Sequence, residues 1–289
     1  MKRSIVWGML ILLGTLCVLT GCSRLTMSAE KRAVVRKYKQ YTYTDPAYNN
    51  EKLMYSVFVP EGYDRSKFYP MVLFMGDAST VGSNPTQALI SCFGATVWAT
   101  PYEQAKHECI VVVPQYDTGT PVVNDKSQAT EYLDITVDLV KYLQTRYSID
   151  VNRIYNTGQS MGGMMSIAMD IKYPDVFAAS FLVACQWDAS LVAPMAKDHL
   201  WIVVSQGDRK AYPGMNSITA ALRNAGAKVA AATWNRDSTT EEFAADVARM
   251  IAQGVNVNYS VLTGGDHRST FDKAYSIEGI RDWMFAQTR

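Results

Sequence analysis

One serine lies between glycines in a stretch that could carry covalent chemistry. The segment "GQSMGG", residues 158–163, sets Ser160 at the centre of a G-x-S-x-G pattern. A serine hydroxyl becomes an effective nucleophile only when a neighbouring base removes its proton. The pattern is typical of a strained strand-to-helix turn that exposes the hydroxyl and needs small flanking residues. Ser160 is therefore a candidate nucleophile, and the alternative is a glycine-rich turn without chemistry.

The base must come from three histidines, His107, His199 and His267. The first two come just before segments that we expect to be strands, whereas His267 follows the last such segment. In a parallel sheet, active-site residues gather beyond the carboxyl ends of the strands. Ser160 also follows its strand, so His267 is the candidate general base. The alternative is a surface-loop histidine.

The acid that would orient this imidazole is Asp208, which ends the segment "LWIVVSQGD" after a predicted strand. A carboxylate in that place holds the ring in the required tautomer and stabilises its charged form. Asp188 follows the preceding strand and is the alternative acid. Asp266 is adjacent to the histidine in sequence, so we do not expect it to face the ring.

Acyl transfer also needs backbone N–H groups that stabilise the oxyanion. We expect one from Met161, directly after the nucleophile, and the other from Gly76 or Asp77, at the end of "PMVLFMGD".

Four further side chains follow strands at the same predicted edge and are candidates for contact with substrate. They are Gln186 and Trp187 after one strand, and Gln115 and Tyr116 at the end of another. Packing in the core or at its rim is the alternative, because aromatic side chains commonly fill such places.

The elements that must position these residues alternate along the chain. Apolar or alternating runs predict strands at residues 41–45, 53–60, 69–77, 109–117, 152–158, 177–186, 200–208 and 257–267,. Helical spacing and closing glycines predict helices at residues 128–147, from 161, 214–227, 239–254 and 274–288,. This order predicts an α/β fold with a mostly parallel sheet, helices on both faces and an antiparallel start.

From about residue 50 to 289 the chain resembles the α/β-hydrolase superfamily. Within it, the chain is similar to esterases and predicted peptidases grouped with polyhydroxybutyrate depolymerases and feruloyl esterases. The resemblance is carried by "YSVFVPEGYD", "YPMVLFMGDAS", "IVVVPQYD", "RIYNTGQSMGG" and "AYSIEGIRDWMF". The order of Ser160, Asp208 and His267 is also the order of that superfamily. The resemblance implies an α/β-hydrolase fold.

Two stretches depart from the pattern of these relatives. Where relatives commonly have His-Gly and a small residue, this chain has Met75, Gly76 and Asp77. A carboxylate beside a developing oxyanion would repel it, so the Asp77 side chain should point away or cap the next element. The acid loop also differs, because Asp208 comes directly after a glycine, earlier than in many relatives.

The first residues have the features of a targeting segment. Lys2 and Arg3 precede an apolar run at residues 5–20, which is too short for a spanning helix and ends in "LTGC",. This ending resembles the lipobox of bacterial lipoproteins, which implies cleavage before Cys22 and a diacylglycerol on its sulfur. An ordinary secretory signal with a chance cysteine is the alternative. We expect a signal peptide at 1–21, a tether at 22–40 and a catalytic domain at 41–289 in the bacterial cell envelope.

Composition limits the other classes of function. The formal net charge of +1 is not typical of a nucleic-acid-binding protein,. Besides Cys17 and Cys22 the chain has Cys92, Cys109 and Cys185, which leaves a Cys92–Cys109 bridge or buried free thiols as alternatives,. Their spacing does not suit zinc, so we assign no metal and no cofactor.

The leading expectation is a lipid-anchored serine hydrolase of carboxylic esters that works through an acyl-enzyme. A serine peptidase with the same three residues is a second hypothesis, because leaving-group chemistry depends on the pocket. Esters are favoured because we identify no added propeller domain in the sequence. A ligand-binding lipoprotein of hydrolase shape that no longer catalyses is the third hypothesis, and a fluorophosphonate label would separate it from the first two.

Overall fold

The computed structural model describes residues 27–118 and 122–289. Cys22 and the signal peptide expected at 1–21 lie outside these residues. No helix in the described part of the chain is both long enough and apolar enough to cross a membrane.

A nine-stranded sheet forms the centre of the described chain, in the order β1-β2-β4-β3-β5-β6-β7-β9-β8. The strands are β1 (Lys39–Asp45), β2 (Glu51–Phe58), β3 (Tyr69–Met75), β4 (Ile110–Gln115), β5 (Ile149–Gln159), β6 (Ala179–Val183), β7 (Leu200–Ser205), β8 (Val229–Asn235) and β9 (Val257–Thr263). β1 and β2 pair antiparallel with each other, and β2 pairs antiparallel with β4. The other pairs are parallel.

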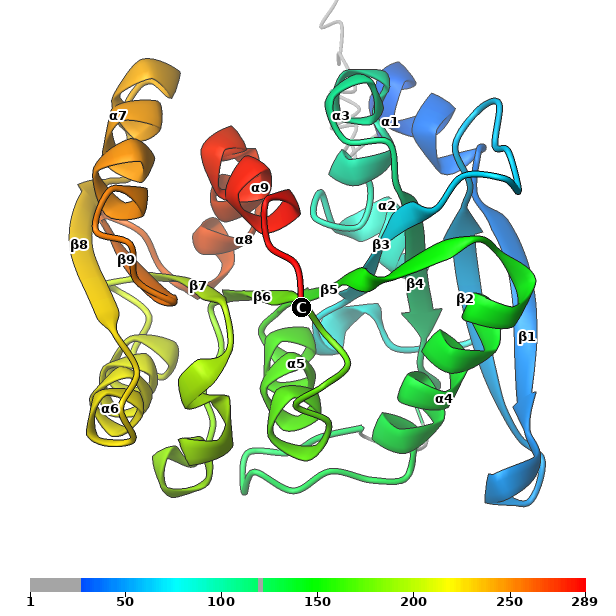
Figure 1. Cartoon of the computed structure of the whole chain (residues 1–289), viewed down its shortest axis with the longest axis horizontal. Coiled ribbons are helices and arrows are strands. Elements are labelled where there is room, and N and C mark those ends of the chain that lie inside the picture. Colours follow the sequence, from blue (N-terminus) through cyan, green and yellow to red (C-terminus); the bar gives the residue numbers. More distant parts are fainter. Residues whose placement is uncertain (1–26, 119–121) are drawn as a thin grey trace, which may run out of the picture.

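Helices cover both faces of this sheet (Figure 1). They are α1 (Ala29–Val35), α2 (Gln87–Ser91), α3 (Pro101–Lys106), α4 (Tyr132–Arg146), α5 (Met161–Lys172), α6 (Ala211–Asn224), α7 (Thr240–Ile251), α8 (His267–Ser276) and α9 (Glu278–Phe285). α4, α5 and α6 lie on one face, and α3, α7, α8 and α9 lie on the other. Each face has its own buried apolar cluster. The arrangement confirms the predicted α/β fold with its antiparallel start.

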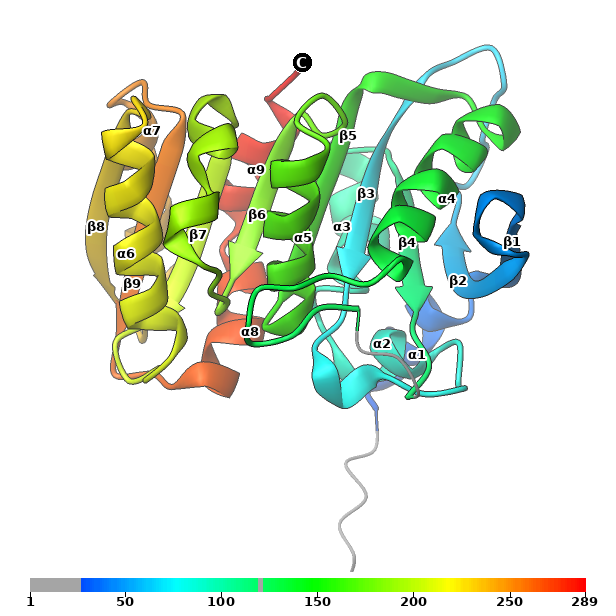
Figure 2. The ribbon, with the colours of Figure 1, turned by 90° about the horizontal axis from the view of Figure 1, so that it is seen from below.

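The central strands are apolar on both sides because helices bury both faces. Every residue of β3 and β4 is buried, which is the pattern of parallel strands inside an α/β protein,. Figure 2 shows the arrowheads of β3, β4 and β6 pointing toward one edge of the molecule, and α8 lies at that edge. Loops that follow parallel strands meet there, which brings distant parts of the sequence together.

The structure differs from the sequence-based prediction at several places, among them the short helices α2 and α3, which were not predicted. Part of the expected tether is folded, since α1 and the start of β1 fall within residues 29–40 and Val34 and Tyr38 are buried. Strand β8 was not predicted, because its alanine-rich sequence carries little strand signal and pairing with β9 decides its conformation,. The helix predicted at 274–288 is two helices, with Ile277 in an extended conformation between α8 and α9.

Candidate active site

The segment around Ser160 forms a sharp turn between β5 and α5. Ser160 has φ 54° and ψ −117°, a conformation that L-residues seldom adopt and that typically marks a functional site,. The turn packs tightly on β3, because a Cβ added at Gly162 would lie 2.0 Å from the Met75 carbonyl oxygen. The Ser160 N–H donates to the carbonyl oxygen of Val183 on β6. These contacts fix the serine at the carboxyl edge of the sheet, half-buried and next to the start of a helix.

His267 lies within hydrogen-bonding distance of both the serine and the acid. Its Nε2 is 2.9 Å from Ser160 Oγ, and its Nδ1 is 2.5 Å from Asp208 Oδ2. A carboxylate oxygen can only accept, so Nδ1–H donates to Asp208 and leaves Nε2 free to accept the serine proton. The His267 side chain is 39% exposed, and its ring packs edge-on against Phe271, one turn along α8. The three side chains predicted from separate segments therefore form one hydrogen-bonded row.

Asp208 is held by the loop between β7 and α6. Its side chain is 3% exposed, and its Oδ1 accepts hydrogen bonds from the backbone N–H groups of Lys210 and Ala211 at 3.0 and 2.9 Å. The neighbouring Gly207 donates its N–H to the carbonyl oxygen of Gly265, just before His267. A Cβ at Gly207 would lie 2.4 Å from that oxygen, so the glycine before the acid allows the two loops to touch.

The two other aspartates considered as acids serve as helix caps. Asp188 accepts from the backbone N–H and the hydroxyl of Ser190, which lowers the pKa of this exposed carboxyl. Asp266 caps α8 by accepting from the backbone N–H of Ser269. The Nδ1 of His267 is bonded to Asp208 instead.

The loop after β3 lies against the start of α5. The carbonyl oxygens of Met75 and Gly76 would lie within 2.8 Å of a Cβ added at Gly162, so the two backbones are in close contact. Neither the Met161 N–H nor the Asp77 N–H donates to a backbone carbonyl in the described part of the chain, and the Asp77 N–H also lies near its own carboxylate and the Cys92 sulfur. Met161 directly follows Ser160, and the loop that carries Asp77 contacts the start of α5, so both are near the place where an oxyanion would form,. The Asp77 carboxylate caps the next turn through the N–H of Ser79, as expected.

Two of the four predicted substrate-contacting residues are buried in other contacts. The Gln115 amide donates to the carbonyl oxygens of Thr80 and Gly82 at 2.7 and 2.9 Å, so it holds the loop after β3 from inside. The buried Tyr116 hydroxyl is 2.9 Å from the Thr136 hydroxyl, and burial raises its pKa well above the usual range. The sequence placed both at the correct edge but did not indicate that they point into the core.

Gln186 lies between α5 and α6, and the next residue, Trp187, is mostly buried. The Gln186 amide is 3.7 Å from the Met164 sulfur on α5 and 3.3 Å from Asp125. Asp125 also forms an ion pair at 2.5 Å with Lys210, which is two residues after Asp208. The pairing of Asp125 with these loops was not expected from the sequence, because the partners are far apart along the chain.

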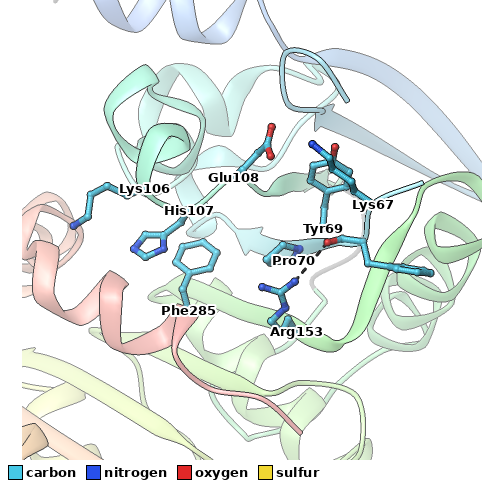
Figure 3. A pocket seen from close by; sticks show the side chains of 9 residues that line it. Lys67, Tyr69, Pro70, Lys106, His107, Glu108, Arg153 and Phe285 are labelled. Carbon is cyan, nitrogen blue, oxygen red and sulfur yellow. Dashed lines mark hydrogen bonds between the residues drawn. The ribbon is translucent and has the colours of Figure 1, made fainter. Parts of the chain in front are cut away.

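The other two histidines lie at the opposite edge of the sheet. His107 lines a cavity of about 290 Å³ at the amino ends of β3 and β4, where its ring lies beside Phe285 (Figure 3). His199 precedes β7, and burial lowers its pKa. Neither can reach Ser160, as the direction of the strands predicted.

One group of side chains in the described residues has spacing that could hold a metal: Glu103, His107 and Asp282. Its carboxylates already have cationic partners, because Arg281 donates to Glu103 at 2.9 Å and Lys106 donates to Asp282 at 2.8 Å. A divalent ion there would face two fixed positive charges, so the group fits an ion-pair network better than a metal site. The cysteines Cys92, Cys109 and Cys185 are buried free thiols, so the alternative of a Cys92–Cys109 bridge is wrong.

Comparison with solved structures shows the same architecture. A thermostable esterase has a TM-score of 0.75 at 22% identity, over 89% of this chain and 64% of that chain. A feruloyl esterase module from Clostridium thermocellum, complexed with sinapinate, has a TM-score of 0.60 at 15% identity, over 84% and 86% of the two chains. At these identities the likeness establishes the fold.

Two curated proteins are similar over shorter stretches. Poly(3-hydroxyalkanoate) depolymerase C from Paucimonas lemoignei is 30% identical over 115 residues, which are 33% of this chain and 27% of the relative. Feruloyl esterase B from Talaromyces stipitatus is 31% identical over 94 residues, 30% of this chain and 25% of the relative. The matched stretch thus spans about a quarter of each relative. A family model described as "Putative esterase" matches residues 47–273, and this chain belongs to that esterase family.

Proposed function

We propose that this protein hydrolyses carboxylic esters through a covalent acyl-enzyme on Ser160. The observation that carries the proposal is the hydrogen-bonded row of Ser160, His267 and Asp208, with 2.9 Å and 2.5 Å between successive partners. A serine at an elbow, a neutral imidazole and a buried carboxylate together make the alcohol nucleophilic. Membership of the esterase family supports the ester as substrate.

The reaction has two stages, acylation of Ser160 and hydrolysis of the acyl-serine, and the same residues act in both. The Ser160 oxygen bonds to the ester carbonyl carbon while its proton passes to His267 Nε2, and Asp208 stabilises the imidazolium. The bond to the alcohol oxygen then breaks, and Nε2 returns the proton to the departing alcohol. Water, deprotonated by the same nitrogen, attacks the acyl-serine, releases the acid and restores the serine hydroxyl.

The developing oxyanion would be held by the backbone N–H groups of Met161 and Asp77. Met161 is the first residue of α5, so its N–H also carries the positive end of the helix dipole,. Donors fixed before the reaction stabilise the transition state more than the ground state, which is the property that catalysis requires.

The acyl or alcohol portion would lie over the surface formed by Trp187, Gln186 and Met164. Trp187 and Met164 are apolar side chains with 9% and 7% of their surfaces exposed. The test is a panel of p-nitrophenyl esters of increasing chain length, with feruloyl and 3-hydroxyacyl esters and a peptidyl p-nitroanilide. We expect ester turnover that is lost in Ser160→Ala. Turnover of the anilide with none of the esters would instead indicate a peptidase.

We also propose that the chain is anchored to a bacterial envelope membrane through diacylglycerol on Cys22. The proposal is supported by "LTGC" at the end of the apolar run and by the folded domain beginning a few residues later, with α1 at Ala29. Mass spectrometry of the mature amino terminus, after expression in a bacterial host, should find an acylated Cys22. An unmodified terminus at another residue would contradict the proposal.

A further inference from the structure

The Asp77 carboxylate lies close to the place where the reaction creates negative charge. Its own backbone N–H is one of the two proposed oxyanion donors, so the carboxylate is attached to the residue that must stabilise an anion. Burial acts to raise the pKa of Asp77, but hydrogen bonds from Ser79 and Gln159 outweigh it and hold the pKa below its ordinary value. The side chain is therefore ionised at neutral pH, and its direction matters for catalysis.

Two sets of contacts hold this carboxylate in place. Within its own loop, Oδ1 accepts from the Ser79 backbone N–H at 2.8 Å and from the Ser79 hydroxyl at 2.5 Å. From β5, the Gln159 amide donates to Oδ2 at 2.8 Å. The buried Cys92 thiol is 3.8 Å from the same Oδ2, on the side of α2. Both oxygens are thus engaged within the protein.

Gln159 is placed to link the two halves of the oxyanion site. It is the residue immediately before the nucleophile, and it is 2% exposed. Its amide nitrogen reaches Asp77 and also lies 3.6 Å from the Cys92 sulfur. Its Oε1 has no hydrogen-bond partner in the described chain, so its donor group makes the polar contacts that keep it there. A buried polar group without a hydrogen-bond partner destabilises the fold, so the bond that the Gln159 amide nitrogen makes to Asp77 is important for keeping this side chain buried,.

We propose that Gln159 is a positioning residue, which binds the Asp77 carboxylate and turns it away from the reacting carbonyl. The same hydrogen bond ties the loop after β3, which carries Asp77, to the elbow that carries Met161. The inference rests on the proposed ester hydrolysis at Ser160. It also explains how this chain accommodates a carboxylate at a position where a small residue was expected.

The test is a double-mutant cycle on Gln159 and Asp77. Gln159→Met keeps the side chain's length and apolar volume but removes the amide donor, which frees the carboxylate. Asp77→Asn removes the charge to which the Gln159 amide donates. We would measure kcat and KM for a p-nitrophenyl ester, and the rate of fluorophosphonate labelling, for both single variants and the double variant.

We expect Gln159→Met to lower kcat by about 10- to 100-fold at nearly constant KM, which is part of the loss seen on removing an oxyanion donor. Asp77→Asn should lower kcat less than Gln159→Met does, because no charge remains to repel the oxyanion. In the Asp77→Asn background, adding Gln159→Met should cost less than about threefold, since interacting residues are not additive.

A matched control is Gln104→Met, which also removes a hydrogen-bonded glutamine amide, in this case one that donates to the carbonyl oxygen of Trp98 at 2.7 Å, away from the elbow. It should change thermal stability without changing kcat. A loss in Gln159→Met that persists fully in the Asp77→Asn background would overturn the proposal, because Gln159 would then act by packing. So would an unchanged kcat in Gln159→Met, or an Asp77→Asn variant as slow as Gln159→Met. Failure of the proposed function is distinguishable, because the unaltered protein would then neither turn over the ester nor label.

Discussion

The molecule contains two histidine–aspartate pairs at opposite edges of one sheet. At the carboxyl edge His267 Nδ1 is 2.5 Å from Asp208, and at the amino edge His107 Nε2 is 2.7 Å from Asp282. The distances are similar, but the surroundings differ. Asp208 is 3% exposed, and the second ring nitrogen of His267 is within hydrogen-bonding distance of the Ser160 hydroxyl. Asp282 is 40% exposed and also forms an ion pair with Lys106. A histidine–aspartate contact therefore indicates catalysis only when the second nitrogen faces a nucleophile.

The surroundings of the amino-edge pair have a structural role. His107 stacks on Phe285 with ring centroids 4.4 Å apart, and Glu103 and Arg281 form a buried ion pair beside it. Arg281 also donates to the carbonyl oxygen of Tyr275, at the end of α8, and so stabilises the break between α8 and α9. These contacts join α3 to α9 and hold the carboxyl-terminal helix on the sheet. The proposed chemistry therefore belongs to the carboxyl edge, and the contacts of the amino edge are structural.

The largest expected difference is between the two histidines. His267→Ala should lower kcat/KM for a p-nitrophenyl ester by about 10⁴-fold or more, because the serine loses its base. His107→Ala should leave kcat/KM within about threefold, because its ring is far from Ser160. Equal losses in the two variants, with both proteins folded by circular dichroism, would remove the distinction between the edges.

Substitutions of the aspartates at the two edges should also differ in their effect on kcat, in the same direction as the histidine substitutions but by a smaller factor. Asp208→Asn should lower kcat by about 10³- to 10⁴-fold while the protein stays folded, because an amide does not hold the required imidazole tautomer. Asp188→Asn and Asp282→Asn are the matched controls and should change kcat less than about threefold. If Asp188→Asn were the slow variant, the acid would have to be reassigned to the loop after β6.

Substitutions at the amino edge should change the free energy of unfolding, whereas those at the carboxyl edge should change kcat. Arg281→Met leaves the Glu103 carboxylate buried without its partner, which should lower the free energy of unfolding by about 3–5 kcal/mol. Lys106→Met removes a half-exposed partner of Asp282 and should cost no more than about 1 kcal/mol. Urea titrations followed by circular dichroism measure both. At a temperature where both variants are folded, kcat should be unchanged, and a large fall in kcat would contradict the division of roles.

The amino edge should also make stability depend on pH, with a smaller effect than Arg281→Met. Burial and the nearby Asp175 raise the pKa of Asp198 to about 7. The folded protein therefore keeps a proton that the unfolded chain loses above about pH 4, so this group makes unfolding easier as the pH rises toward 7. Between pH 5 and 8 the free energy of unfolding should fall on the order of 2 kcal/mol. Asp198→Asn should reduce that fall and Asp188→Asn should not; the same slope in all three proteins would contradict the assignment.

The sequence predicted the parts of the site that follow directly from strand direction. The glycines around Ser160 indicated the turn, and the ends of the strands separated His267 from His107 and His199. These inferences need only local pattern and the geometry of a parallel sheet. The same argument placed Asp208 at this edge, but it placed Asp188 there too, so Asp208 was favoured with Asp188 left as the alternative. The central strands and most helices were also predictable, because burial on two faces makes their apolar runs continuous.

Other features depend on contacts between distant residues and were not predictable. Gln115 follows the correct strand, but whether its amide faces substrate or the Thr80 carbonyl depends on the fold of the loop after β3. The hydrogen bond between Gln159 and Asp77 joins residues 82 positions apart. The break at Ile277 lies in a continuous helical pattern, and the Arg281 contacts that stabilise it involve α3 and α8.

The most direct test of the account is to find the residue that carries the covalent bond. The intact protein is incubated with a fluorophosphonate, digested and sequenced by tandem mass spectrometry, beside Ser160→Ala and His267→Ala. We predict one adduct, on the peptide that contains Ser160, no adduct in Ser160→Ala, and labelling slowed by orders of magnitude in His267→Ala because the serine keeps its proton. An adduct on another residue, or equal labelling of the Ser160→Ala variant, would contradict the claim that Ser160 is the nucleophile.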